Sequence, residues 1–296
     1  MSVLKQFLQK TTCAALCALT AAVAASCSAK EPNTSDDNSA NHSVTTAAVR
    51  PVANLVHNDA ALADVNSYAQ IDNTKRGFGQ GRQLDKENRP AGAIDFNQCF
   101  GKYDALAIHP AEQKTITLTF DQGYENGYTT KILDTLKEKN VHAIFFVLQD
   151  YAEKNPELVS RMIAEGHIVG NHSVTHRSMP GLSVQNCISE VMNLHTYMLE
   201  NFNYEMHLFR PPMGEFSERS LAVTKDCGYK TMMWSYAYAD WDVNKQPDPD
   251  TALKNLVKFA HNGEILLLHS VSKTNTAILP AFIDQMLAQG YTFTTE

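Results

Sequence analysis

From residue 115 to the C-terminus, short apolar or β-branched runs alternate with segments that have helix boundary residues. The runs lie at residues 115–120, 143–147, 167–169, 207–209, 230–234, 265–268 and 291–294. This alternation is typical of α/β domains with a mainly parallel sheet. We therefore expect one α/β domain, and, if the sheet curls, a distorted, incomplete (β/α)7-type barrel with functional residues in the loops at its strand ends.

Three of the intervening segments carry plain helix boundaries. Asn155-Pro156 predicts a helix start, and Gly166 predicts the end of that helix. Ser217 and Gly228 bound a second helix in the same way. A third helix is expected to begin near Ser183, because apolar residues after it recur on one helical face.

The first 26 residues have the composition of an export signal. Lys5 and Lys10 are their only charges, and the apolar stretch that follows is too short to span a bilayer comfortably. The expected signal ends in Ala24-Ala25-Ser26-Cys27. This segment resembles a bacterial lipoprotein signal with a lipid anchor on Cys27. An ordinary cleaved signal and an uncleaved anchor remain alternatives. We expect an exported protein, either anchored to the membrane through that lipid or secreted.

The remaining chain divides into three segments. Residues 27–67 are rich in Ser, Asn, Thr, Ala and Asp without hydrophobic periodicity, which predicts a disordered linker. Residues 68–113 mix Gly-rich and charged pieces with scattered aromatic residues and predict an irregular N-terminal cap. Residues 114–296 form the expected single catalytic domain.

Charge and cysteine content exclude several classes of protein. The net charge is −7, and removal of the signal, with its two Lys and no acids, makes it −9. Nucleic acid is therefore not expected as a partner, since such binding needs a basic surface. Cys99, Cys187 and Cys227 form no CxxC pair, so a cysteine zinc site is not supported. Whether two of these three cysteines form a disulfide is left open by the sequence.

Polar residues follow three of the expected strands in the first part of the domain. Asp121 comes directly after the first strand, and Arg210 follows the run at 207–209. His172 and His176 are spaced four residues apart, so in a helical turn both rings would share a face and reach one cation. Arg210 is followed by two prolines and could hold a carboxylate in a two-pronged pair.

Two further polar elements follow later strands. Asp240 and Trp241 come after the run at 230–234, and His269 ends the apolar run at 265–268. Taken singly, each of the five elements has a structural explanation, such as a loop carboxylate or a packed histidine. Together they supply a base, metal ligands, an orienting cation, a second carboxylate and an acid at the strand ends of one sheet.

The order of these five elements resembles the motifs of the polysaccharide deacetylase family, whose shared region is called the NodB homology domain. The matching segments read TFDQG, HSVTH, RPPMG, ADW and LLLH. The likeness covers residues 115–296. A closer resemblance, to the delta-lactam biosynthetic de-N-acetylases that act on muramic acid in spore-cortex peptidoglycan, reaches back to about Arg76.

The resemblance implies a role for each matched residue. Asp121 matches the catalytic base, which Arg210 orients, and His269 matches the general acid, which Asp240 tunes. Further matches are Met213, whose backbone N–H helps to hold the oxyanion, Trp241 beside the catalytic histidine, and the metal ligands His172 and His176.

Gln122 departs from the family pattern. Most members have a second Asp at this position, which completes an Asp-His-His metal site, whereas the spore-type branch commonly has Asn. Gln122 is therefore a candidate third ligand. A neutral amide oxygen donates less charge than a carboxylate, so weaker metal binding or a changed preference is expected. The implied cofactor is a divalent cation, with Zn, Co or Mn favoured.

The resemblance thus predicts a hydrolase that removes acetyl groups from N-acetylated amino sugars of peptidoglycan strands, with metal assistance. Muramic acid is the expected sugar, and its deacetylation can lead to the muramic delta-lactam in a sporulation setting. One alternative is a deacetylase for N-acetylglucosamine in peptidoglycan or chitooligosaccharides. Another, suggested by Gln122, is a glycan-binding protein with a decayed site.

Overall fold

The computed structural model describes residues 65–296. The predicted signal at 1–26, the proposed lipid site Cys27 and the predicted linker up to residue 64 lie outside this range. The described chain begins with the short 3-10 helix η1 (Val65–Gln70), which crosses the boundary predicted at residue 67. Within residues 65–296, no helix combines the length and apolar character needed to cross a bilayer.

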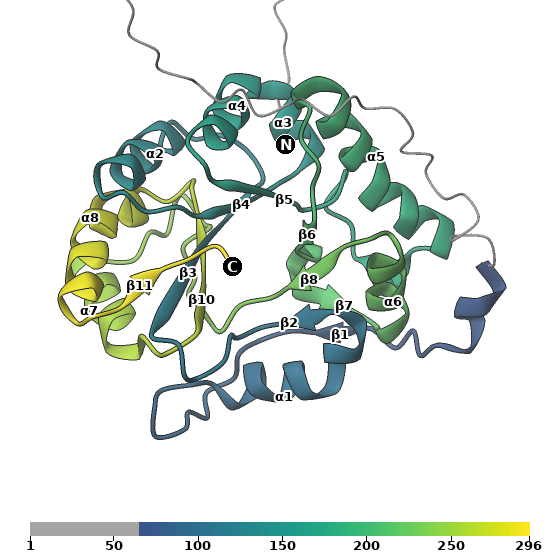
Figure 1. The fold of residues 1–296 in the computed structure, drawn as a ribbon, viewed down its shortest axis with the longest axis horizontal. Helices are drawn as coiled ribbons and strands as arrows, with labels where there is room; N and C mark the ends of the chain where they lie inside the picture. Colours follow the sequence, from purple (N-terminus) through teal and green to yellow (C-terminus); the bar gives the residue numbers. More distant parts are fainter. Residues whose placement is uncertain (1–64) are drawn as a thin grey trace, which may run out of the picture. The chain divides into compact units, whose positions relative to one another are not determined.

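A curved, nine-stranded sheet forms the centre of the domain (Figure 1). Its strands pair in parallel in the order β2-β8-β6-β5-β4-β3-β10-β9, and β11 pairs with β3 off this path. The strands are β2 (Ala105–Leu106), β3 (Thr115–Gln122), β4 (Ile144–Val147), β5 (Ile168–Asn171), β6 (Leu208–Phe209), β8 (Lys230–Met232), β9 (Tyr236–Ala237), β10 (Glu264–His269) and β11 (Thr292–Phe293). The seven predicted runs are confirmed as strands, and β2 and β9 at the two edges leave the barrel incomplete, as predicted.

Helices surround the outside of this sheet (Figure 1). They are α2 (Thr129–Glu138), α3 (Gln149–Lys154), α4 (Pro156–Ala164), α5 (Val184–Phe202), α6 (Glu218–Asp226), α7 (Pro249–Phe259) and α8 (Lys273–Ala288). Two predicted starts are confirmed by their capping bonds. The Ser183 hydroxyl accepts from the N–H of Asn186, and Ser217 forms a reciprocal capping box with Ser220.

The cap is more regular than the sequence predicted. It contains the helix α1 (Ala91–Phe100) and the short 3-10 helix η2 (Gly101–Tyr103), and it supplies β2 to the main sheet. Its strand β1 (Arg76–Gly77) pairs antiparallel with β7 (Glu215–Phe216). Two further 3-10 helices are η3 (Met179–Gly181) and η4 (Pro212–Gly214). An aromatic cluster around Phe96 joins this cap to the domain, so the expected irregular segment is a packed layer.

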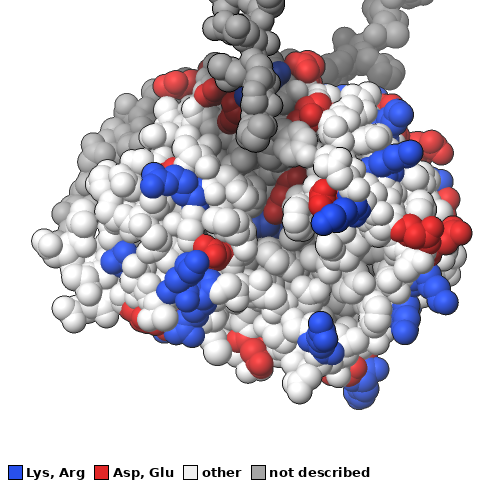
Figure 2. All heavy atoms as spheres, turned by 180° about the vertical axis from the view of Figure 1, so that it is seen from behind, with Lys and Arg blue, Asp and Glu red and all other residues white. Residues whose placement is uncertain are grey.

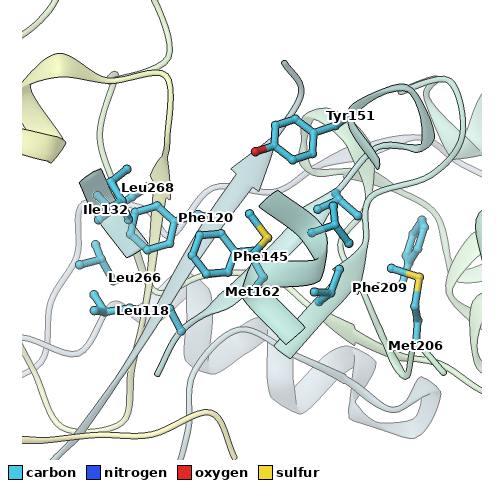
Figure 3. Packing of buried hydrophobic residues seen from close by; sticks show 14 of the residues in the cluster. Leu118, Phe120, Ile132, Phe145, Tyr151, Met162, Met206, Phe209, Leu266 and Leu268 are labelled. Carbon is cyan, nitrogen blue, oxygen red and sulfur yellow. The ribbon is translucent and has the colours of Figure 1, made fainter. Parts of the chain in front are cut away.

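Alternation along the strands separates two hydrophobic regions. On β4, Ile144 and Phe146 point into the barrel, whereas Phe145 and Val147 face the outer helices. The Phe145 ring stacks on Phe120 of β3 with ring centroids 5.2 Å apart, among Leu118, Leu266 and Leu268 (Figure 3). Burial of each such large side chain contributes about 1.5–3 kcal/mol, so this outer layer stabilises the strands that carry the site.

Charges of both signs are spread over the surface. On the face seen in Figure 2, Lys and Arg side chains are interspersed with Asp and Glu. A ligand approaching this face therefore meets charges of both signs.

The three described cysteines form no disulfide. Cys99 is exposed, Cys187 is buried and Cys227 is half-buried, and all three are free thiols.

Candidate active site

The carboxyl ends of the parallel strands line a cavity of about 840 Å³. Six predicted site residues line this cavity: Asp121, His172, His176, Met213, Trp241 and His269. The other three, Gln122, Arg210 and Asp240, are fully buried. Asp121 and His269 are register partners on the adjacent strands β3 and β10, so the sheet itself brings them side by side.

Asp121 is held as a buried carboxylate by Arg210. An Nη1 hydrogen of Arg210 is donated to Oδ1 of Asp121 over 2.8 Å, and both side chains are almost entirely inaccessible to solvent. Burial alone would raise the pKa of Asp121, but the charges of Arg210 and the neighbouring imidazoles outweigh it and lower that pKa. Asp121 is therefore ionised at neutral pH, as a proton acceptor must be.

The contact between Arg210 and Asp121 is single, not the predicted two-pronged pair. The same Nη1 also donates to the Thr119 hydroxyl, while Nε and Nη2 donate to the backbone oxygens of Met232 and Met233. The guanidinium lies 4.2 Å from the centroid of the Phe146 ring. Because its planar donors are shared among several strands, Arg210 fixes the barrel interior as well as the carboxylate.

His172 and His176 come together beside Asp121. Their ring centroids are 5.0 Å apart, and Nε2 of His172 lies 3.7 Å from Oδ2 of Asp121. Burial lowers the pKa of His172 to about 4 and also lowers that of His176, so both rings are neutral at pH 7. Nδ1 of His172 bonds to the Arg210 carbonyl oxygen over 2.8 Å. That carbonyl can only accept, so Nδ1 carries the hydrogen and Nε2 presents a lone pair.

The predicted helical turn between the two histidines is wrong. Residues 172–176 form an irregular loop in which Ser173 and His176 have left-handed backbone conformations, with φ of 79° and 57°. Glu190 on α5 holds this loop: its carboxylate accepts from the N–H of Thr175 over 2.8 Å and from the Thr175 hydroxyl over 2.5 Å. The rings meet because tertiary contacts shape the loop, not because of a helical repeat.

His269 is paired with the buried carboxylate of Asp240. Nδ1 of His269 lies 2.8 Å from Oδ1 of Asp240, and the backbone N–H of His269 donates to Oδ2 over 2.8 Å. Asn275 on α8 donates to the same Oδ2. Burial would lower the pKa of His269, but the hydrogen bond and charge of Asp240 outweigh it and raise that pKa. With Nδ1 turned to Asp240, Nε2 is the nitrogen left for the cavity.

Met213 and Trp241 lie at the exposed rim of the cavity. Their exposed fractions are 54% and 60%, high for large apolar side chains. Met213 has a left-handed φ of 59° inside η4, and such conformations in non-glycine residues are costly unless the surroundings impose them. The backbone of this loop is therefore held in a special conformation at the cavity wall.

The residues present fit a cation held by two imidazoles. Both rings are neutral, and the His172 tautomer offers a nitrogen ligand. Oε1 of Gln122 is a buried oxygen without a hydrogen-bond partner, while its Nε2 donates to Ser270 over 2.5 Å. Within the described range, no group of three or more His, Cys, Asp or Glu side chains could hold a metal. Gln122 does not itself line the cavity, so its orphaned amide oxygen remains the predicted third donor without being placed beside the two imidazoles.

Comparisons with known proteins identify the family of this chain. The family model described as polysaccharide deacetylase matches residues 109–232. The chain is 40% identical over 225 residues to the peptidoglycan-N-acetylmuramic acid deacetylase PdaA of Bacillus subtilis, covering 75% of this chain and 85% of that one. This chain belongs to the polysaccharide deacetylase family. It is accordingly a hydrolase of amide bonds in acetylated polysaccharides.

Solved structures place this polysaccharide deacetylase among the family 4 carbohydrate esterases. The structure of Bacillus subtilis PdaA superposes with a TM-score of 0.72 and 38% identity, covering 76% of this chain and 96% of that one. A peptidoglycan-N-acetylglucosamine deacetylase of Bacillus cereus is 31% identical over 191 residues, covering 63% of this chain and 88% of that one. The predicted half-barrel and single catalytic domain are confirmed.

Sequence reasoning missed several residues of the deacetylase site. Glu190, Asn275 and Thr119 support predicted residues through hydrogen bonds, and Phe78 and Gln80 of the cap line the cavity. The only local signal for Glu190 was an acid among the apolar residues on one face of α5. The others act over long sequence separations that a single sequence does not reveal.

Proposed function

We propose that this protein removes the acetyl group from N-acetylmuramic acid residues of peptidoglycan strands with the assistance of a divalent cation. The observation that carries the proposal is the convergence of an ionised Asp121 and a protonatable His269 on one cavity beside two neutral imidazoles. The names of the relatives favour peptidoglycan as the polymer.

The extent of the match to PdaA favours muramic acid, whereas the muramic acid deacetylase PdaC of Bacillus subtilis matches over only 66% of the chain. The match to the muramic acid deacetylase covers 75% of the chain, which is more than residues 114–296 contain, so it extends into the cap. The match to the N-acetylglucosamine deacetylase covers 63%, about the extent of residues 114–296 alone. Because the cap lines the cavity, the additional shared segment lies where it can act on substrate choice.

His172 and His176 are the proposed metal ligands, with Oε1 of Gln122 as the third. A bound divalent cation acidifies water and polarises a carbonyl oxygen, which addresses the two difficulties of amide hydrolysis. The neutral state of both imidazoles at pH 7 supports this assignment. Zn, Co and Mn suit imidazole nitrogen together with an oxygen ligand.

The chain's own residues supply the proton transfers. Asp121, kept ionised by Arg210, takes a proton from the water that attacks the acetamide carbonyl carbon. The backbone N–H of Met213 donates to the developing oxyanion. His269, whose protonated form Asp240 stabilises, gives the proton on Nε2 to the sugar nitrogen as the C–N bond breaks. The products are acetate and a free amino sugar, whose amine can condense with the lactyl carboxyl to form a lactam and release one water.

Deacetylation of N-acetylglucosamine is the second candidate, because the Bacillus cereus relative bears that activity in its name. A glycan-binding protein without activity is less well supported. Binding alone would need neither the buried Asp121–Arg210 pair nor the Asp240–His269 pair. We also propose that the protein is exported and carries a lipid anchor on Cys27. The proposed linker, cap and catalytic domain are residues 27–67, 68–113 and 114–296.

Mass analysis of products from defined substrates tests the proposed function. We expect acetate release from peptide-stripped peptidoglycan at its muramic acid residues, and less from chitooligosaccharides. Metal content is measured on the same enzyme sample, with Zn, Co, Mn and Mg added separately. Acetate release only from glucosamine residues would favour the second candidate, and glycan binding without acetate release under any metal would favour the non-catalytic one.

A further inference from the structure

A short segment of the cap forms one wall of the cavity. Phe78, Gly79 and Gln80 line it together with Asp121 and His269, although they precede the first catalytic strand by more than thirty residues. We propose that this segment, the cap wall (residues 78–80), determines which amino sugar fits, with Gly79 leaving room for the lactyl ether of muramic acid. The inference rests on the proposed function.

Backbone pairing joins the cap wall to the loop that carries Met213. Strand β1, directly before it, pairs with β7, directly after η4. The N–H of Phe78 donates to the carbonyl oxygen of Gly214 over 2.8 Å. Gly214 has a φ of +64°, and a Cβ there would lie 2.7 Å from the Trp234 ring. The same Cβ would lie 3.5 Å from the carbonyl oxygen of Phe78, so the wall and the proposed oxyanion loop are in direct contact.

Gln80 ties the cap wall to the segment that follows β8. Its Oε1 accepts from Nε1 of Trp234 over 3.0 Å, and its Nε2 donates to the carbonyl oxygen of Ala237 over 3.1 Å. The Phe78 ring meets the Trp234 ring edge to face, with centroids 5.1 Å apart. Both ends of the Gln80 amide are satisfied, so Gln80 is a positioning residue that fixes the wall against the segment leading to Asp240.

Helix α1 supports the cap wall from outside. A Cβ at Gly92 of α1 would lie 2.7 Å from the carbonyl oxygen of Gln80, so a glycine is needed for this close approach. The wall is therefore held by β7, by Trp234 and by α1 at once. A wall fixed on three sides discriminates by shape, because it cannot move aside for a larger ligand.

Gly79 is the open point of this fixed wall. A Cβ at Gly79 would meet no atom within 4 Å, and the residue is exposed to the cavity. N-acetylmuramic acid differs from N-acetylglucosamine by a lactyl ether on O3, so the larger sugar needs additional space beside the ring. The structure provides such space at Gly79, between the anchored residues Phe78 and Gln80.

Gly79→Leu tests the inference, with Gly79→Ala as a milder variant. We expect kcat/KM for peptide-stripped peptidoglycan to fall at least about tenfold in Gly79→Leu and less in Gly79→Ala, while acetate release from chitooligosaccharides changes little. Gly101→Leu is the matched control, because a Cβ there also meets nothing within 4 Å and Gly101 lies in the cap away from the cavity. This control is expected to behave as the unchanged protein on both substrates.

An equal loss on both substrates, or an unchanged kcat/KM on peptidoglycan in both Gly79 variants, would overturn the inference. An unchanged protein that releases no acetate from muramic acid would instead refute the proposed function. Gln80→Ala gives a second readout: we expect a higher KM for peptidoglycan with kcat largely kept, whereas a purely structural role would lower the folded fraction and leave KM unaltered.

Discussion

The two ends of the paired strands β3 and β10 carry buried ionisable groups with opposite behaviour. At the carboxyl end, Asp121 beside His269 has Arg210 as a partner, and its pKa is lowered. At the other end, Glu264 is fully buried, one carboxylate oxygen has no hydrogen-bond partner, and burial raises its pKa to about 8. Burial is common to both, so a nearby cation decides whether a buried acid stays ionised. The proposed proton-transfer groups lie at the end where Arg210 provides that cation.

The largest expected effect comes from removing charge at the catalytic end alone. Asp121→Asn should lower kcat by about 10²- to 10⁴-fold, because an amide cannot accept the proton of the attacking water. Glu264→Gln is the matched variant at the other end and should leave kcat within about threefold. Acetate release by the purified proteins measures both. Wild-type turnover in Asp121→Asn would refute the role of base.

Asp240→Asn should move the pH profile. The charge of Asp240 raises the pKa of His269, so its loss lowers that pKa, and the acid is then deprotonated at a lower pH. The high-pH limb of kcat/KM is expected to move to lower pH, and activity above the limb should fall about tenfold for every pH unit that the limb moves. Asp242→Asn, two residues away, is the control. An unmoved limb would mean that His269 is not the group titrating there.

Glu190→Ala should weaken metal binding without removing a ligand. The loop of His172 and His176 would lose the bonds from Thr175, and supporting residues of this kind typically contribute about 10- to 100-fold in metal affinity. Titration of the apo protein with Zn measures the change. Glu200→Ala, on an exposed position of the same helix, should bind metal as the unchanged protein does. Equal affinity in both variants would contradict the positioning role.

The last expected effect concerns the free energy of unfolding and arises at the Glu264 end. Its pKa is higher folded than unfolded, so Glu264 costs nothing below about pH 4.5, and its cost grows as pH rises toward about 8. The slope reaches at most about 1.4 kcal/mol per pH unit. Glu264→Gln should remove this fall in the free energy of unfolding, measured by denaturant titration from pH 5 to 8. The same pH dependence in both proteins would show that Glu264 ionises freely.

The sheet and several boundaries followed from local sequence. The strand runs carry their own periodicity, and the starts at Ser183 and Ser217 carry their own caps, so both could be predicted. Helix α1 could not, because Gly92 lowers its local helical signal and packing of Phe96 stabilises it. These are the places where tertiary packing outweighs propensity.

The candidate site shows the same division. The set of residues at the strand ends could be predicted from the sequence. Each of them directly follows a strand, and parallel strands end at one edge of a sheet. The loop conformation at His172–His176 did not, because it depends on Glu190 from a helix elsewhere in the chain. The single contact of Arg210 depends on Thr119 and on two backbone oxygens of a distant segment. Such contacts have no signature within one short motif.

The register pairing of Asp121 with His269 has a consequence for how such enzymes diversify. Neighbouring strands sit about 4.8 Å apart, a spacing that backbone hydrogen bonding sets for any sequence. The separation of Asp121 and His269 is therefore set by the sheet. Sequence changes in the surrounding loops leave it unaltered. New polymers can be accommodated by exchanging the peripheral segments, and grafting a different cap is the natural starting point for redesigning selectivity.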